Sequence, residues 1–143
     1  SLQEPTKKMS KSDELEKSTI YITDDGKEIV NKIKRAVTDS GSEVKFTNEK
    51  PGIRNLISLY NVATGKSIEE IVKEFEGRGY GEFKATVAEA VAEFIRPVRE
   101  KYEQLRDDKK YLEKVLTKGA DDARRTAFKT LRKVYKKIGF VQF

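Results

Sequence analysis

The hydrophobic positions of this chain follow a helical spacing over most of its length. After Asp25, apolar residues recur every three or four positions across the range 29–37, which places them on one side of a helix. Asp25 and Glu28 have the spacing of a capping box, so we expect the helix to begin there. The small and polar residues 39–42 then predict its end.

Two further helices follow. Pro51 suits a first helical turn, and Gly65 is placed to close this helix. Apolar residues cover most of the circumference between them, so we expect this helix to be the most buried element. Ser67 and Glu70 repeat the capping-box spacing and predict a short helix through Phe75.

The longest predicted helix runs from about Glu82 to Asp107, and Pro97 inside it is expected to cause a kink. A short segment at 110–116 precedes Gly119, and a final helix then runs to Ile138. The apolar residues on one face of the long helix are Phe83, Val87, Val91, Phe94, Val98, Tyr102 and Leu105.

The start of the chain has a different pattern. Residues 1–18 are charged and nearly free of apolar side chains, which is typical of a loop, and Thr19–Ile22 has the β-branched and aromatic character of a short extended segment. We therefore predict an all-α fold, a helical bundle preceded by a loop and an extended link. The domain boundaries expected from this pattern are 1–22 for the loop and link and 23–143 for the helical domain.

Composition restricts the chemistry available to the 143 residues. The chain has neither cysteine nor histidine, which removes disulfides, the commonest general base and zinc sites of the Cys/His type. No pair of carboxylates stands out as an acid–base couple, so we expect no independent catalysis and no metal site. No run of eighteen apolar residues and no signal-peptide pattern occurs, which predicts a cytoplasmic protein without a membrane partner.

The net charge of +6 favours a polyanionic partner. In the final predicted helix, Arg125, Lys129, Arg132 and Lys136 fall on one side, almost opposite the apolar face. We call these four residues the basic stripe. A row of this kind could follow the phosphates of a nucleic acid, or it could be the solvated face of a basic protein.

The opening loop contains a more specific pattern. Lys8-Met9-Ser10-Lys11-Ser12 is the signature loop of class I aminoacyl-tRNA synthetases, and further stretches in order along the chain resemble bacterial tryptophanyl-tRNA synthetases. Those stretches are Ala36–Ser40, Lys50–Ile53 with Asn55-Leu56, Gly65–Glu70, Gly79–Gly81 with Phe83-Lys84, and Glu93–Ile95 followed by Pro97.

This resemblance implies a role for each residue of the loop. Residues 8–12 would bind ATP, which carries Mg²⁺ in the complete enzyme. Lys8 and Lys11 would act in catalysis by stabilising charge on the departing phosphates as the aminoacyl adenylate forms. Ser10 and Ser12 would support the loop by hydrogen bonding. No cofactor is expected to bind tightly to this chain alone.

The chain also departs from the family's pattern. The family's other ATP motif contains histidines, and its Rossmann domain and tryptophan pocket precede the signature loop, but this chain contains neither the motif nor those parts. We therefore expect a carboxyl-terminal piece that begins just ahead of the loop and is inactive alone. Its expected partners are the amino-terminal Rossmann domain and the tRNA for tryptophan, in a homodimeric parent enzyme.

Two alternatives remain open at this point. The chain could be a helical module that binds RNA or supports structure without catalysis. It could also be the equivalent part of a related class I enzyme such as a tyrosyl-tRNA synthetase, although the usual signature of that group differs from KMSKS.

Overall fold

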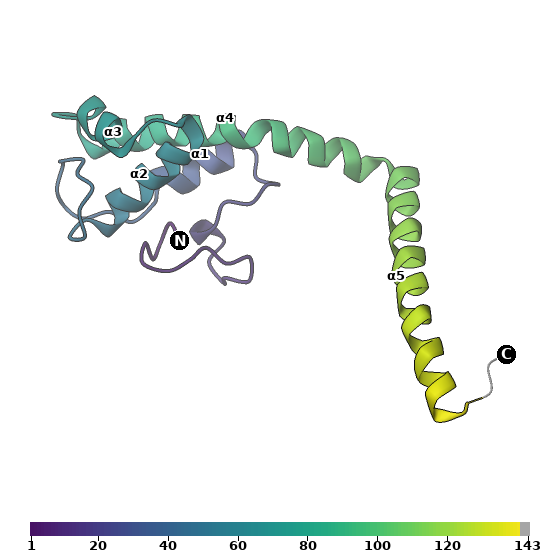
Figure 1. Ribbon diagram of the computed structural model, residues 1–143. Helices are drawn as coiled ribbons and strands as arrows, with labels where there is room; N and C mark the ends of the chain where they lie inside the picture. The colour runs from purple at the N-terminus through teal and green to yellow at the C-terminus, as the bar shows by residue number, and fades with distance from the viewer. Residues whose placement is uncertain (141–143) are drawn as a thin grey trace. The chain divides into compact units, whose positions relative to one another are not determined.

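The computed structural model describes residues 1–140, and all regular secondary structure in that range is helical. The prediction of an all-α fold is therefore confirmed. The chain divides into two compact units, residues 1–102 and the residues from 103 onward, which are described separately here. The elements are the 3₁₀ helix η1 (Glu16–Ser18) and the α-helices α1 (Gly26–Lys34), α2 (Pro51–Thr64), α3 (Ile68–Glu74), α4 (Tyr80–Asp107) and α5 (Lys109–Ile138) (Figure 1).

Two helices of the first unit begin at the predicted capping boxes. At the start of α1, the Glu28 N–H donates to Asp25 Oδ1 at 2.7 Å, and the Asp25 N–H donates to Glu28 Oε2 at 2.8 Å. Ser67 and Glu70 make the same reciprocal pair of bonds at the start of α3. These bonds satisfy backbone donors that have no partner within the helix, which is why the local sequence determines both starts.

The predicted burial of α2 is also confirmed. It has five buried residues, more than any other helix in the described part of the chain. Pro51 is its first residue, and Gly65 ends it with a φ of 74°, a left-handed conformation that glycine adopts without steric cost. The buried residues of α2 are Gly52, Ile53, Leu56, Ile57 and Tyr60.

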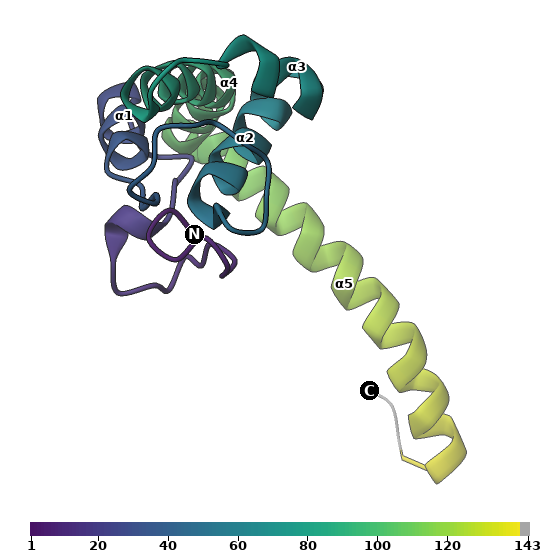
Figure 2. The ribbon, with the colours of Figure 1, turned by 90° about the vertical axis from the view of Figure 1, so that its left-hand side faces the viewer.

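The core of the first unit joins α1, α2 and α3 to the first half of α4 (Figure 2). Phe75 lies just after α3 and makes edge-to-face contacts on two sides, with ring centroids 4.9 Å from Phe83 and 5.8 Å from Tyr60. Phe75 and Phe83 are almost completely buried. Burying rings of this size is among the largest hydrophobic contributions that single residues make.

The apolar face of α4 is buried only in its first half. Phe83, Val87 and Val91 lie in the core, whereas Phe94 and Val98 are 51% and 52% exposed. The sequence pattern therefore extends the apolar face past the point where the other helices cover it. Pro97 lies inside α4, which continues through it as one helix.

The second unit consists mainly of α5. The predicted break at Gly119 is wrong, because one helix runs from Lys109 to Ile138. A glycine in a helix interior costs only about 1 kcal/mol relative to alanine, and good helix formers flank it on both sides. Gly139, with a φ of 77°, ends the helix as expected. Across residues 1–140, no helix is both long and apolar enough to cross a membrane.

Candidate functional site

The loop that carries residues 8–12 is closed at its base. The Leu2 N–H donates to the Ser18 carbonyl oxygen at 2.9 Å, so the chain returns to its starting point after the loop. The Val37 N–H donates to the Leu2 carbonyl oxygen at 2.8 Å, and Asn55 Nδ2 donates to the Ser1 carbonyl oxygen at 3.2 Å. Because Leu2 is itself buried, the helical unit holds the base of the loop.

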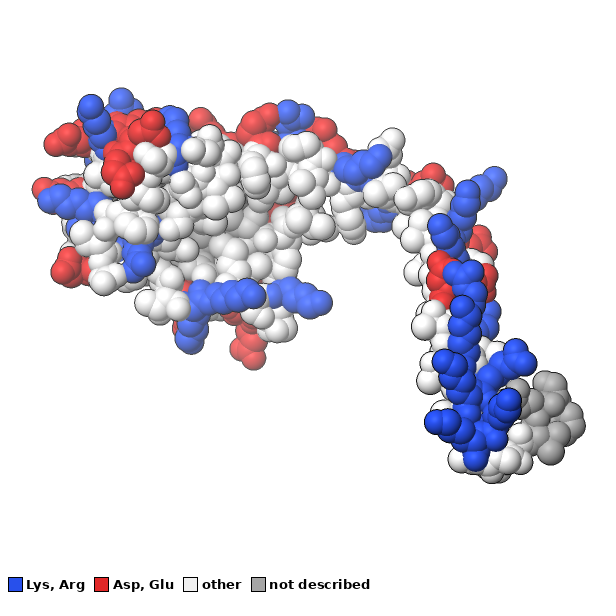
Figure 3. Space-filling view, viewed as in Figure 1, with Lys and Arg blue, Asp and Glu red and all other residues white. Residues whose placement is uncertain are grey.

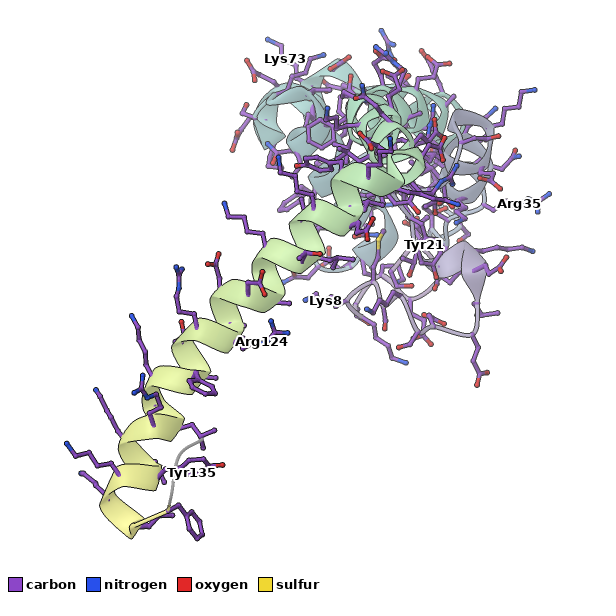
Figure 4. All side chains as sticks on the ribbon, turned by 90° about the vertical axis from the view of Figure 1, so that its right-hand side faces the viewer. Lys8, Tyr21, Arg35, Lys73, Arg124 and Tyr135 are labelled. Atoms are coloured by element: carbon purple, nitrogen blue, oxygen red, sulfur yellow. The ribbon has the colours of Figure 1, made fainter. Side chains whose placement is uncertain are left out.

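Within the loop, the two signature lysines and the methionine have opposite environments. Lys8 and Lys11 are exposed, and Figure 4 shows the Lys8 side chain extending from the loop. Met9, between them, is half-buried and packs against the core. Ser10 Oγ and Ser12 Oγ lie 3.1 Å apart. Met9 therefore holds the loop against the hydrophobic core, while both ammonium groups face solvent, where an anion could reach them.

Lys7 differs from the two signature lysines although it is adjacent to one of them. Its Nζ lies 2.5 Å from Glu4 Oε2, and the hydrogen bond that the Lys7 ammonium donates to this carboxylate raises the pKa of Lys7. The exposed ion pair partly neutralises Lys7. Lys7 is thus distinguished from Lys8 and Lys11 by its ion pair, a difference that the sequence alone does not show.

A second polar cluster connects the segment before α2 to the start of α4. Lys50 Nζ donates to Tyr80 Oη at 2.7 Å and to Asp39 Oδ1 at 3.0 Å, and Tyr80 Oη lies 2.8 Å from the same carboxylate oxygen. Partial burial alone would raise the pKa of Asp39. The hydrogen bonds from Lys50, Tyr80 and the Gly41 N–H outweigh this and lower the pKa to about 2.

This pKa predicts how stability changes in acid. The folded-state pKa of Asp39 lies below its ordinary value of 3.8. This carboxylate therefore makes its full contribution to the free energy of unfolding above about pH 5, and the contribution is lost as the pH falls toward 2. We expect Asp39→Asn to lower the urea midpoint at pH 7, with a difference from the unsubstituted protein that shrinks between about pH 4 and pH 2. Glu89→Gln, at an exposed position of α4, is the control, and a difference that is constant with pH would contradict the assignment.

A separate contact joins α4 to the base of the loop through the backbone between α1 and α2. Lys84 Nζ, from α4, donates to the Ala36 carbonyl oxygen at 2.8 Å. Val37 follows Ala36 in the chain, and its N–H donates to the Leu2 carbonyl oxygen. Gly52 of α2 packs directly against the Val37 carbonyl. Sequence reasoning did not find these contacts, although most of their residues lie in the stretches that resemble the synthetases.

The basic stripe lies on α5, in the second unit. This helix has eleven lysines and arginines and three carboxylates, and Figure 3 shows basic side chains gathered toward its end. Two carboxylates form ion pairs within the helix: Asp122 with Arg125 at 2.7 Å and Asp121 with Arg124 at 2.8 Å. Arg125 is thus partly neutralised, while Lys129, Arg132 and Lys136 continue the row.

Comparison with known proteins identifies the family. The family model described as tRNA synthetases class I (W and Y) matches residues 1–96, which is most of the first unit and includes the whole of the loop. This chain belongs to that family. Among residues 1–140, no group of three or more Asp, Glu, His or Cys side chains could hold a metal ion.

Individual synthetases match nearly the whole chain. The tryptophan–tRNA ligase of Bacillus anthracis is 52% identical over 140 residues, and that of Clostridium perfringens is 49% identical over 140 residues. The matches cover 97% and 98% of this chain but 42% of each ligase. The crystal structure of tryptophanyl-tRNA synthetase from Mycoplasma pneumoniae superposes with a TM-score of 0.71 at 26% identity, over 99% of this chain and 45% of that one.

Proposed function

We propose that this chain is the carboxyl-terminal part of a tryptophan–tRNA ligase, which activates L-tryptophan with ATP and transfers it to its tRNA. The observation that carries the proposal is the loop 8–12, with Lys8 and Lys11 in solvent and Met9 packed on the core. Identity of about half to ligases for tryptophan supports this amino acid over tyrosine. The proposed partners are an amino-terminal Rossmann domain, a second subunit and the tRNA for tryptophan.

The loop suits the phosphates of ATP by its chemistry. Activation of an amino acid releases pyrophosphate, so negative charge grows on the departing phosphates in the transition state. Two ammonium groups that meet this charge stabilise the transition state more than the bound substrate, and this difference accelerates the reaction. Mg²⁺ would arrive with the nucleotide, and Ser10 and Ser12 would support the loop through their hydroxyl contact.

A fusion protein tests the proposal. In it, this chain is joined to the part of a ligase that it does not match, and we call the product the joined ligase. In the joined ligase, this chain replaces the matched 140 residues of the Bacillus anthracis enzyme. We expect tryptophan-dependent exchange of pyrophosphate into ATP from the joined ligase and none from the chain alone. A folded joined ligase without exchange, or exchange that depends on tyrosine instead, would contradict the proposed function.

The charge of α5 favours a second role for the chain, which is binding the tRNA through the basic stripe. Eleven basic residues against three carboxylates give this helix a surplus of eight positive charges. Within residues 103–140, no residue of α5 is buried. Each lysine or arginine that neutralises a phosphate releases counterions, so tRNA affinity is expected to fall as salt rises.

Substitution of the whole basic stripe is expected to reduce this salt dependence. With Arg125, Lys129, Arg132 and Lys136 changed to glutamine, the slope of log K against log salt should become shallower by about three to four, because each phosphate contact contributes roughly 0.9. The measurement is titration of the joined ligase with the tRNA for tryptophan at several salt concentrations. The same titration is made with a copy of the tRNA altered in its anticodon.

The matched control removes the same charge from the first half of the same helix. It changes Lys109, Lys110, Lys114 and Lys118 to glutamine, and we expect a smaller change in slope. Equal slopes for the two variants would mean that α5 attracts RNA only through its total charge, and would contradict the stripe as a binding site.

A further inference from the structure

Thr19 lies beneath the signature loop and plays no part in the chemistry described so far. It follows η1 directly, has an extended backbone and is only 6% exposed. Its hydroxyl donates a hydrogen bond to the Ser10 carbonyl oxygen at 3.0 Å, across nine positions of the sequence. A buried hydroxyl that bonds to the centre of the loop is a contact made by tertiary structure and not by a local turn.

The contact reaches the peptide group that precedes Lys11. A peptide group is planar, so the Ser10 carbonyl, the Lys11 N–H and the Lys11 Cα all lie in one plane. A bond that fixes the Ser10 carbonyl therefore fixes the plane of this peptide group and the position of the Lys11 Cα, from which the side chain extends. The Asp13 N–H also donates to the Ser10 carbonyl, at 3.2 Å, and this bond closes a turn that contains Lys11 and Ser12.

Thr19 is well placed to transmit the position of the helices to the loop. The residue before it, Ser18, accepts the Leu2 N–H at 2.9 Å, and Leu2 in turn accepts the Val37 N–H. The Ser18 hydroxyl donates to the Leu15 carbonyl oxygen at 2.7 Å, which holds this end of η1 in shape. Burial and these neighbouring bonds keep the Thr19 hydroxyl in one place beneath the loop.

We propose that Thr19 is a positioning residue for amino-acid activation: through its hydrogen bond to Ser10 it aims the Lys11 ammonium at the phosphates of ATP. This inference rests on the proposed function of the loop. Thr19 is buried beneath the loop, so its effect is expected in the rate of activation and not in tryptophan binding. A residue that acts only in the transition state changes kcat more than KM.

The test replaces Thr19 by valine and by serine in the joined ligase. Valine keeps the shape and removes the hydroxyl, whereas serine keeps the hydroxyl. For Thr19→Val we expect kcat of tryptophan-dependent exchange to fall about tenfold, as the loss of one hydrogen bond predicts, with KM for tryptophan unchanged. Thr19→Ser should retain most of the activity, which a role in packing alone would not predict.

Thr86→Val is the matched control. The Thr86 hydroxyl donates to the Glu82 carbonyl oxygen at 3.1 Å within α4, so the same hydroxyl-to-carbonyl bond is lost away from the loop, and kcat is expected to stay unchanged. Equal kcat for Thr19→Val and the unsubstituted enzyme would overturn the proposal. So would an equal loss of activity in Thr19→Val and Thr19→Ser.

Hydrogen–deuterium exchange separates this inference from the proposed function. In the same proteins, the peptide covering residues 8–13 is expected to exchange several-fold faster in Thr19→Val than in Thr19→Ser or Thr86→Val, because loss of the bond frees the Ser10 peptide. If the unsubstituted joined ligase did not catalyse pyrophosphate exchange, the proposed function would be contradicted. The deuterium uptake would still decide whether Thr19 holds the loop. Unchanged uptake in Thr19→Val would overturn the positioning role.

Discussion

Lys11→Ala in the joined ligase is expected to slow tryptophan-dependent pyrophosphate exchange roughly 100- to 1,000-fold, the usual effect of removing one group that stabilises developing charge. Lys11 is exposed, and its backbone belongs to the turn closed by Ser10 and Asp13. Truncation of its side chain therefore leaves the contacts of the loop with the core in place. The loss should appear in kcat, with KM for tryptophan little changed.

Lys17→Ala is the control for this result. Lys17 is also an exposed lysine of the amino-terminal segment, so the substitution removes the same charge at a short distance along the chain without touching the signature. We expect its effect to stay within about twofold, as is usual for exposed surface residues. Similar losses for the two variants would indicate a general effect of charge and would remove Lys11 from the mechanism.

Gly52→Ala is expected to destabilise the protein by about 2–3 kcal/mol, although alanine is the better helix former. A Cβ at position 52 would overlap the carbonyl oxygen of Val37, a backbone atom that a side-chain rotation cannot move. The chain must shift either α2 or the segment that holds Leu2. Urea unfolding of the substituted and unsubstituted proteins measures the difference.

Gly81→Ala supplies the matched comparison. Gly81 is the second residue of α4, as Gly52 is of α2, and a Cβ added there would meet nothing within 4 Å. The same change is therefore expected to be neutral or to stabilise the protein by up to about 1 kcal/mol. If both variants lost stability equally, the cost would come from the helix start in general and not from the contact with Val37.

The sequence was informative wherever a few neighbouring residues decide the structure. Asp25 with Glu28 and Ser67 with Glu70 determine helix starts through bonds three positions apart. Gly65 ends α2 because glycine adopts a left-handed backbone conformation without steric cost. The signature at 8–12 is also local, because five adjacent residues carry it, and the role of these residues stays a prediction.

Sequence reasoning missed the contacts between distant positions. The bonds from Thr19 to Ser10 and from Lys50 to Tyr80 span nine and thirty positions, and no spacing rule relates such pairs. Gly119 shows the opposite error, because a residue that usually interrupts helices lies within α5. Its local cost of about 1 kcal/mol is small beside the cooperative stability of a long helix.

The closed base of the loop has a consequence for nucleotide affinity. Ordering the backbone of one residue costs about 1–2 kcal/mol in conformational entropy, and a ligand that had to order the whole segment would bind correspondingly weakly. Leu2 and Ser18 are already joined at 2.9 Å, so for the proposed binding of ATP the base of the loop is ordered before the nucleotide binds. Under the proposed function, substitutions near Val37 are therefore expected to weaken nucleotide binding although Val37 is not a residue proposed to contact the nucleotide.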